Sequence, residues 1–407
     1  MKAYERFLKY VAYDTQSDDA SKTVPSTAKQ LVLGTELAKE LEELGAKNVE
    51  LDENGYVYGT IPASAGSEKK PVLALVAHMD TAPDASGTNV KPHIVKQYDG
   101  KDIVLNAEKN IVTKVVDFPD LKKYVGDDLI VTDGTTLLGA DDKAGVAEIM
   151  TIAEELLSGK GPKHPEIRVV FTPDEEIGAG VAHINMQKVD AAYGYTVDGE
   201  EIGELCYENF NAASATVTFR GVCVHPGSAF GIMRNAALLA MEFHQMLPVF
   251  ENPAATVGRM GFYHLNNMEG RMESAKLHYI LRDHDAAKLA ARKKLVEDAA
   301  AYMNEKYGAG TVQVEITDSY RNMYEKIMPD NAFLIDDARE AMKEAGVKPI
   351  ESPIRGGTDG ATLSYMGLPC PNLGTGGHAC HGCHEFIPIQ SMEKAVDILR
   401  HLVARLA

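Results

Sequence analysis

This 407-residue sequence has no long apolar runs and few cysteines. The longest apolar run, residues 72–77, is far below the ~20 residues of a membrane-spanning helix. The first residues after Met1 lack an apolar signal-peptide core, so we expect neither secretion nor membrane insertion. Five cysteines, an odd number in a long chain, do not form a disulfide framework. These absences predict a protein of the reducing cytoplasm.

Positive charge is also in short supply. Forty-one Lys and Arg residues stand against 59 Asp and Glu residues, which gives a formal net charge of −18. Such an acidic surface repels nucleic-acid phosphates and anionic lipids, so neither nucleic acid nor a membrane is an expected partner. A phosphate-cradling Gly-x-x-x-x-Gly-Lys string is absent, which argues against nucleotide binding.

The first two hundred residues alternate between helical and strand-like patterns. Residues 26–44 have the apolar spacing of a helix that ends at Gly45, and residues 144–157 repeat that spacing. Residues 72–77 and 167–172 are short apolar runs typical of buried strands. Alternating strands and helices predict an α/β domain, with a mostly parallel twisted sheet covered by helices on both faces.

The pattern changes near Phe210, where a smaller domain is inserted. We expect its elements in the order strand 213–219, helix 235–247, strands 260–265 and 275–281, helix 286–307 and strand 311–317. This βαββαβ order predicts an α+β sandwich with a half-exposed antiparallel sheet. The predicted boundaries place the α/β domain at 1–208 and 323–407, and the inserted domain at 209–322.

Four predicted strand-like segments end in residues that bind metals or move protons: His78 and Asp80, Asp141 and Asp142, Glu175 and Glu176, and Asp198. Each group alone has an ordinary explanation, such as a helix cap or a solvated loop. Strand ends of an open α/β sheet, however, line the crevice where ligands bind. Imidazole and carboxylate together suit Zn²⁺, Mn²⁺ or Co²⁺. The coincidence therefore favours a metal site.

The order of these residues resembles a family of two-metal peptidases that includes aminopeptidases, carboxypeptidases, dipeptidases and deacylases. The resemblance covers nearly the whole chain. It rests on the strings Ala77-His78-Met79-Asp80-Thr81, Gly139-Ala140-Asp141-Asp142-Lys143-Ala144-Gly145, Thr172-Pro173-Asp174-Glu175-Glu176-Ile177-Gly178, Val197-Asp198-Gly199, Arg355-Gly356-Gly357-Thr358-Asp359-Gly360 and His381-Gly382-Cys383-His384-Glu385. The strings around Asp141 and Arg355 are similar to those of the family's tripeptide aminopeptidases.

The resemblance implies a ligand set for two divalent metal ions. Asp141 would bridge the ions, His78 and Asp198 would complete one site, and Glu176 and His381 would complete the other. Zn²⁺ is the expected metal, with Mn²⁺ or Co²⁺ as alternatives. The implied reaction is hydrolysis of the N-terminal peptide bond of short peptides, above all tripeptides.

The resemblance also gives roles to residues that do not bind metal. Glu175 would be the general base acting on the bridging water, and Asp80 would orient His78. In relatives, the residue corresponding to His225 stabilises the oxyanion, often from a partner subunit, which implies a lid and a homodimer interface in the inserted domain. Arg355 and Arg282 are candidates for binding a substrate carboxylate, because guanidinium pairs with it through two parallel bonds.

One stretch departs from the family pattern. Residues 376–385 hold three histidines and two cysteines, where relatives have a single ligand histidine. Cys380-x-x-Cys383 could form a small structural zinc site or a redox pair. We interpret His381 as the ligand, with His378 as its rival.

Two other functions remain open from the sequence. The chain could be a dipeptidase, carboxypeptidase or deacylase of the same family. It could also be a non-catalytic metal-binding or scaffold protein on this fold.

Overall fold

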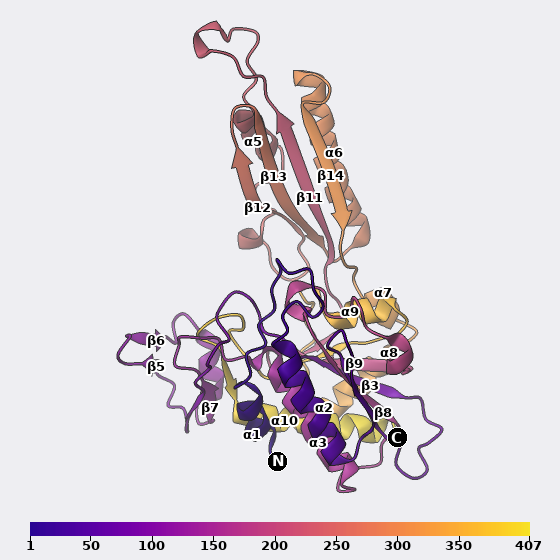
Figure 1. Cartoon of the computed structure of the whole chain (residues 1–407). Coiled ribbons are helices and arrows are strands. Elements are labelled where there is room, and N and C mark those ends of the chain that lie inside the picture. Colours follow the sequence, from indigo (N-terminus) through magenta and orange to yellow (C-terminus); the bar gives the residue numbers. More distant parts are fainter. The chain divides into compact units, whose positions relative to one another are not determined.

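The computed structural model describes residues 1–407 and divides into two compact units (Figure 1). Unit 1 comprises Met1–Tyr207, Glu325–Ser352 and Thr358–Ala407, and unit 2 comprises Glu208–Tyr324 and Pro353–Gly357. The loop Pro353–Gly357 was expected in the α/β domain. It clusters with unit 2 because the Ile354 amide donates to the Glu208 carbonyl (2.8 Å) and the Arg355 guanidinium donates to the Gly258 carbonyl (2.6 Å).

Unit 1 is built around a seven-stranded sheet in the order β1-β2-β8-β3-β9-β15-β10. Its strands are β1 (Lys47–Leu51), β2 (Val57–Ile61), β3 (Leu73–His78), β8 (Ile167–Thr172), β9 (Tyr193–Val197), β10 (Leu205–Cys206) and β15 (Asn372–Leu373). The central strands β8, β3, β9 and β15 pair in parallel, whereas β1–β2, β2–β8 and β10–β15 pair antiparallel. The sheet is therefore mixed, with its parallel core in the middle.

Helices cover both faces of this sheet. The helices of unit 1 are α1 (Ala3–Tyr10), α2 (Gln30–Leu44), α3 (Ala140–Leu157), α4 (Met186–Val189), α7 (Tyr324–Ile327), α8 (Ala332–Glu344), α9 (Asp359–Tyr365) and α10 (Ile389–Arg405). Every residue of β3 is buried. Ala74 and Val76 face a cluster with Leu363 of α9, and the alternate residues Leu73 and Leu75 face the opposite side. The predicted α/β class with two covered faces is confirmed.

Two smaller sheets in unit 1 were not predicted. Strands β4 (His93–Val95), β7 (Leu129–Val131) and β16 (Phe386–Pro388) form one of them, in the order β16-β7-β4, and β5 (Ile103–Asn106) pairs with β6 (Ile111–Thr113). A separate core that includes Tyr124, Leu129 and Phe386 holds them together. This part of unit 1 fixes the chain on either side of residues 379–385.

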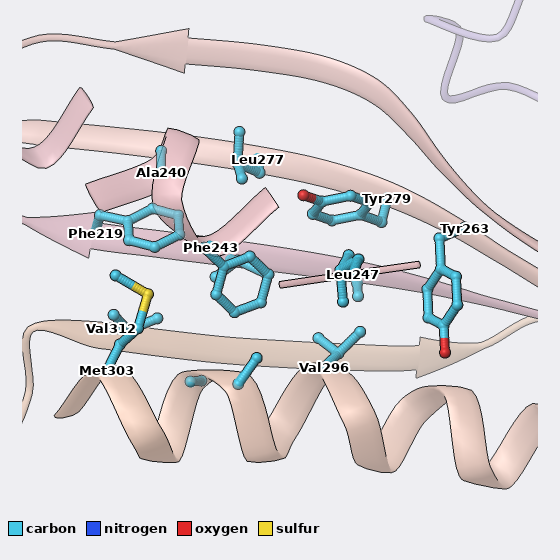
Figure 2. Packing of buried hydrophobic residues seen from close by; sticks show 14 of the residues in the cluster. Phe219, Ala240, Phe243, Leu247, Tyr263, Leu277, Tyr279, Val296, Met303 and Val312 are labelled. Carbon is cyan, nitrogen blue, oxygen red and sulfur yellow. The ribbon is translucent and has the colours of Figure 1, made fainter. Parts of the chain in front are cut away.

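Unit 2 contains the predicted βαββαβ order, in β11 (Asn211–Arg220), α5 (Ala236–Gln245), β12 (Phe262–Gly270), β13 (Ser274–Asp283), α6 (Ala286–Tyr307) and β14 (Val312–Asp318). Its four strands are all antiparallel, in the order β12-β13-β11-β14. Figure 2 shows Phe243 from α5 and Val296 and Met303 from α6 packed with Leu277 of the sheet. Both helices therefore share one core, while the alternating exposure of β13 leaves the other face of that strand open.

None of the helices is long and apolar enough to cross a lipid bilayer.

Candidate metal centre

The candidate centre begins at the carboxyl ends of the parallel strands. His78 is the last residue of β3 and pairs in register with Thr172, the last residue of β8. Asp198 follows directly after β9, and Asp141 lies at the start of α3. Parallel strands deliver their C-terminal side chains to one edge of a sheet, so residues more than sixty positions apart meet there.

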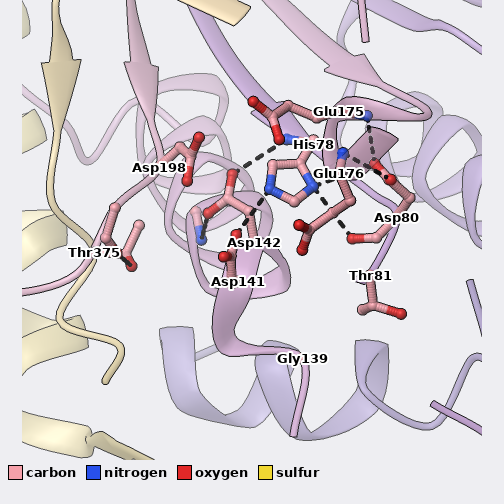
Figure 3. Close-up of polar contacts among 12 residues, drawn as sticks. His78, Asp80, Thr81, Gly139, Asp141, Asp142, Glu175, Glu176, Asp198 and Thr375 are labelled. Carbon is pink, nitrogen blue, oxygen red and sulfur yellow. Dashed lines mark hydrogen bonds and ion pairs between the residues drawn. The ribbon is translucent and has the colours of Figure 1, made fainter. Parts of the chain in front are cut away.

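Two groups of side chains lie close enough to hold metal ions. One consists of His78, Asp141 and Asp198, and the other of Asp141, Glu176 and His381. Within each group, the possible ligand atoms all lie within 4.8 Å of one another. Asp141 belongs to both groups: its Oδ1 is 2.9 Å from Nε2 of His78 and its Oδ2 is 3.2 Å from Nε2 of His381. Figure 3 shows the carboxylates of Asp141, Asp198 and Glu176 around the ring of His78.

Asp80 joins the imidazole of His78 to the loop that carries Glu175 and Glu176. Its Oδ1 lies 3.3 Å from Nδ1 of His78. The Glu175 amide donates to Asp80 Oδ1 (3.0 Å) and the Glu176 amide donates to Asp80 Oδ2 (3.2 Å). A carboxylate on one ring nitrogen fixes the tautomer that leaves the other nitrogen free for a ligand.

The two imidazoles are electrostatically matched to the carboxylates around them. Burial disfavours a charged His78, but Asp141 and Asp80 outweigh burial and raise the pKa of His78 above its usual range. Burial likewise opposes ionisation of Asp141, yet the hydrogen bonds of His381 and His78 hold the pKa of Asp141 below its usual range. Asp141 and Glu176 raise the pKa of His381 to about 11. The centre therefore stabilises positive charge.

Carboxylates outnumber imidazoles here, so the two histidines do not compensate all of the negative charge. Burial, reinforced by Asp141, raises the pKa of Glu176 to about 7. Burial also raises the pKa of Asp198 to about 7. The Oε1 atom of Glu176 is buried without a hydrogen-bond partner. Two histidines, three carboxylates and this unpartnered oxygen match the ligand chemistry of Zn²⁺, Mn²⁺ or Co²⁺, so the residues present fit two divalent ions.

The histidine-rich stretch places His381, and not His378, beside the carboxylates. Nε2 of His381 is 3.0 Å from Oε2 of Glu176. His378 is buried elsewhere: its Nε2 lies 2.6 Å from the Tyr124 hydroxyl, and its ring stacks on Phe386 at 5.0 Å between ring centroids. Burial lowers the pKa of His378 to about 4, so this histidine is a neutral core residue.

The two cysteines of the same stretch lie outside both candidate ligand groups. Cys380 and Cys383 are not joined in a disulfide. Neither belongs to a group of His, Cys, Asp or Glu residues close enough to hold an ion. The interpretation of Cys380 and Cys383 as ligands of a structural zinc site is therefore not supported.

Asp174 lies directly before Glu175 and was not among the predicted site residues. Its carboxylate accepts hydrogen bonds from the Ser26 amide (2.7 Å), the Ser26 hydroxyl (2.5 Å) and Nε2 of Gln30 (2.6 Å). Its φ of 56° is left-handed, a conformation that Asp tolerates better than most residues. Asp174 thereby anchors the residue directly before Glu175. An Asp between a strand-ending Pro173 and two glutamates was the available signal.

The remaining predicted residues lie in unit 2. His225 is exposed, and its Nδ1 accepts a hydrogen bond from the Gly227 amide (3.1 Å). Arg282 donates to the carbonyls of Ala213 (3.2 Å) and Leu281 (3.0 Å) and lies over the Tyr320 ring. Within this unit Arg282 therefore has the contacts of a structural residue.

Arg355 is also held by unit 2. Its Nη1 donates to the carbonyls of Gly258 (2.6 Å) and Met260 (3.0 Å), and its Nη2 donates to the Thr256 hydroxyl (2.9 Å). The guanidinium carbon lies 5.1 Å from the centroid of the Phe210 ring. These contacts fix the orientation of its side chain.

Known proteins resemble this chain along nearly its whole length. Residues 133–405 match the model of peptidase family M20/M25/M40. The chain is 52% identical over 403 residues to peptidase T of Caldanaerobacter subterraneus subsp. tengcongensis, which covers 99% of this chain and 98% of that protein. It is 53% identical over 399 residues to peptidase T of Desulfitobacterium hafniense strain Y51, with 98% and 97% covered.

Solved structures have the same fold. Aminopeptidase PepT from Bacillus cereus superposes with a TM-score of 0.78 at 22% identity, covering 100% of this chain and 98% of that chain. A tripeptidase from Staphylococcus aureus gives a TM-score of 0.77 at 22% identity, with the same coverage. With relatives above 50% identity along nearly its whole length and a family match that spans most of the centre, the chain belongs to peptidase family M20/M25/M40.

Proposed function

We propose that the protein is a two-metal aminopeptidase that releases the N-terminal residue of tripeptides. The observation that carries the proposal is the membership of Asp141 in both ligand groups, because one shared carboxylate is what two neighbouring ions require. Relatives that are 52–53% identical to this chain are named peptidase T. This supports an aminopeptidase over a dipeptidase, carboxypeptidase or deacylase.

In this proposal, His78 and Asp198 hold one ion, Glu176 and His381 hold the other, and Asp141 bridges them. The bound ions would lower the pKa of a shared water and polarise the scissile carbonyl. Zn²⁺ is our expected metal, because imidazole and carboxylate are common Zn²⁺ ligands, and the same donors also accept Mn²⁺ or Co²⁺.

Glu175 acts as the general base. An ionised carboxylate that does not itself bind metal can take a proton from water and give it to the leaving amine. Its amide hydrogen bond to Asp80 (3.0 Å) fixes its backbone beside the ligand loop. Asp80 positions both His78 and Glu175, so it couples the metal site to the base.

Unit 2 supplies the groups that recognise the substrate. His225, exposed and next to Pro226, is suited to stabilise the oxyanion of the tetrahedral intermediate. Arg355, oriented by Gly258, Met260 and Thr256, is our candidate for the substrate carboxylate, with Arg282 as a weaker second. Recognition of both ends of a short peptide would limit its length.

We also propose that two copies of the chain associate through unit 2. Leu238 and Met241 of α5 are 62% and 51% exposed, and Met268 of β12 is 44% exposed. β12 is an edge strand of its sheet, so its outer backbone groups are open to pairing with another strand. Sedimentation of the wild type beside Leu238→Glu tests this, because a charge on the apolar face should yield monomers.

We place the protein in the cytoplasm. The five unpaired cysteines fit action in a reducing cytoplasm.

One assay series tests the proposed activity. The wild type should hydrolyse a free tripeptide and fail on the same tripeptide with an acetylated amino terminus, because an aminopeptidase must bind the free amine. Chelation should abolish turnover, and Zn²⁺, Mn²⁺ or Co²⁺ should restore it. Release of the C-terminal residue first, or equal turnover of the acetylated peptide, would reject the aminopeptidase.

A further inference from the structure

A buried carboxylate outside the proposed ligand set holds the loop that delivers Asp141. Glu385 is 1% exposed. Its Oε2 accepts hydrogen bonds from the amides of Leu138 and Gly139 (both 2.7 Å), and its Oε1 accepts one from the amide of Asp141 itself (3.1 Å). Three amide donors on one carboxylate form a strong, charge-assisted arrangement.

Glu385 also lies on the loop that presents His381. The amide of His378 donates to the Phe386 carbonyl (2.9 Å) and the amide of Phe386 donates to the His378 carbonyl (3.1 Å), which closes residues 379–385 into a loop. His381 lies in this loop with a left-handed φ of 64°. Its side chain is 47% exposed, so little packing surrounds the ring to hold it in place.

We propose that Glu385 is a positioning residue that ties the Asp141 loop to the His381 loop and so sets the spacing of the ligand group formed by Asp141, Glu176 and His381. The proposal rests on the proposed two-metal function, because it concerns how the second ion is held. We call the three hydrogen bonds of Glu385 to the Asp141 loop the Glu385 clamp. His78 and Asp198 reach the centre from β3 and β9 and do not depend on this clamp. The loss of Glu385 should therefore affect the two ions unequally.

The chemistry of the donors explains why a carboxylate is needed. All three partners of Glu385 are N–H groups, and a carboxylate has only acceptors to offer them. The amide of Glu385→Gln would turn its NH₂ toward at least one of these N–H groups. That N–H group would then be buried without an acceptor, which is unfavourable. We expect the Asp141 loop to move in order to relieve this.

Metal titration of the metal-free protein tests the proposal without using turnover. Calorimetry and the absorption of bound Co²⁺ should show two ions in the wild type. In Glu385→Gln, one ion should bind about 10–100-fold more weakly, as is typical when a group that orients a ligand is lost, while the other is less affected. Glu148→Gln is the matched control, because Glu148 is a fully buried glutamate in α3 with no hydrogen-bond partner. It should bind both ions normally.

Amide hydrogen exchange in the metal-free protein gives a second readout. The amides of Leu138, Gly139 and Asp141 should exchange slowly in the wild type and faster in Glu385→Gln, with no change in the middle of α3. Fast exchange of these amides in the wild type would overturn the proposal. So would a folded Glu385→Gln with wild-type affinity for both ions.

The outcomes separate this proposal from the proposed function. If Glu385→Gln does not fold, Glu385→Asp replaces it, since a carboxylate one methylene shorter cannot keep all three bonds. It should weaken the same ion, and unchanged affinity would reject the clamp. A wild type that binds two ions but does not cleave tripeptides would refute the aminopeptidase and leave the clamp standing.

Discussion

His78 and Asp80 are two residues apart in sequence, and Nδ1 of His78 lies 3.3 Å from Oδ1 of Asp80. The same carboxylate accepts the amides of Glu175 and Glu176. One buried side chain therefore aligns a ligand imidazole with the loop that carries the proposed base and a second ligand.

Asp80→Asn should disrupt this alignment. An amide has one acceptor oxygen, so the variant keeps at most part of the contacts with His78 and the two amides. We expect metal affinity or kcat/KM to fall by about 10–100-fold, as measured by metal analysis and tripeptide turnover. Asp117→Asn, at an exposed position, is the control. Unchanged metal content and turnover in Asp80→Asn would contradict the role given to this carboxylate.

Glu175→Gln should abolish proton transfer without loss of metal. The amide keeps the size of the side chain but cannot accept the proton of the water. We expect kcat to drop by about 10²–10⁴-fold with both ions bound, and Glu53→Gln in an exposed turn to behave as wild type. Loss of an ion from the Glu175→Gln protein would instead identify Glu175 as a ligand.

His225→Ala should lower kcat and leave stability unchanged. Loss of one oxyanion-stabilising donor costs about 10²–10³-fold in kcat. Because His225 is exposed, its removal should change the free energy of unfolding by less than about 0.5 kcal/mol. Tripeptide kinetics and thermal melts measure the two effects, with the exposed His93→Ala as control. A normal kcat would exclude His225 from the reaction.

Glu148 should make stability depend on pH. Burial raises the pKa of this carboxyl well above its usual value, so it stays protonated in the folded state after the unfolded chain has ionised. Stability should therefore fall as pH rises above the unfolded pKa, by about 1.4 kcal/mol per pH unit until the folded pKa is reached.

Glu148→Gln removes that ionisation. The variant should melt at nearly the wild-type temperature near pH 4 and above it at pH 8, as calorimetry would show. A difference in melting temperature that stays constant across this range would show that Glu148 does not titrate in this way.

The sequence predicted much of the fold because its signals are local. The helix expected over residues 286–307 is α6 to the residue, and the strand expected over 167–172 is β8. The first is rich in Ala and Lys, which favour helices, and the second is an apolar run that ends abruptly at Pro173. Strands β4, β6 and β7 have three residues each, which is too short for an alternation of apolar and polar residues to be recognised. The two smaller sheets were therefore not predicted.

The residues of the centre also differ in how well the sequence predicts them. His78 and Asp141 could be found because they end recognisable segments within familiar strings. Asp174 and Glu385 stand in the same strings, but their roles depend on amides and side chains more than a hundred residues away, which no local pattern predicts. The transfer of the Arg355 loop to unit 2 likewise depends on distant carbonyls.

The late position of His381 has a consequence for biosynthesis. His381 and Glu385 follow Asp198, the last of the other candidate ligands, by 183 and 187 residues. A nascent polypeptide that stalls on the ribosome before this point would lack one histidine of the second group. Truncated translation products of this peptidase should therefore be inert toward the peptides around them.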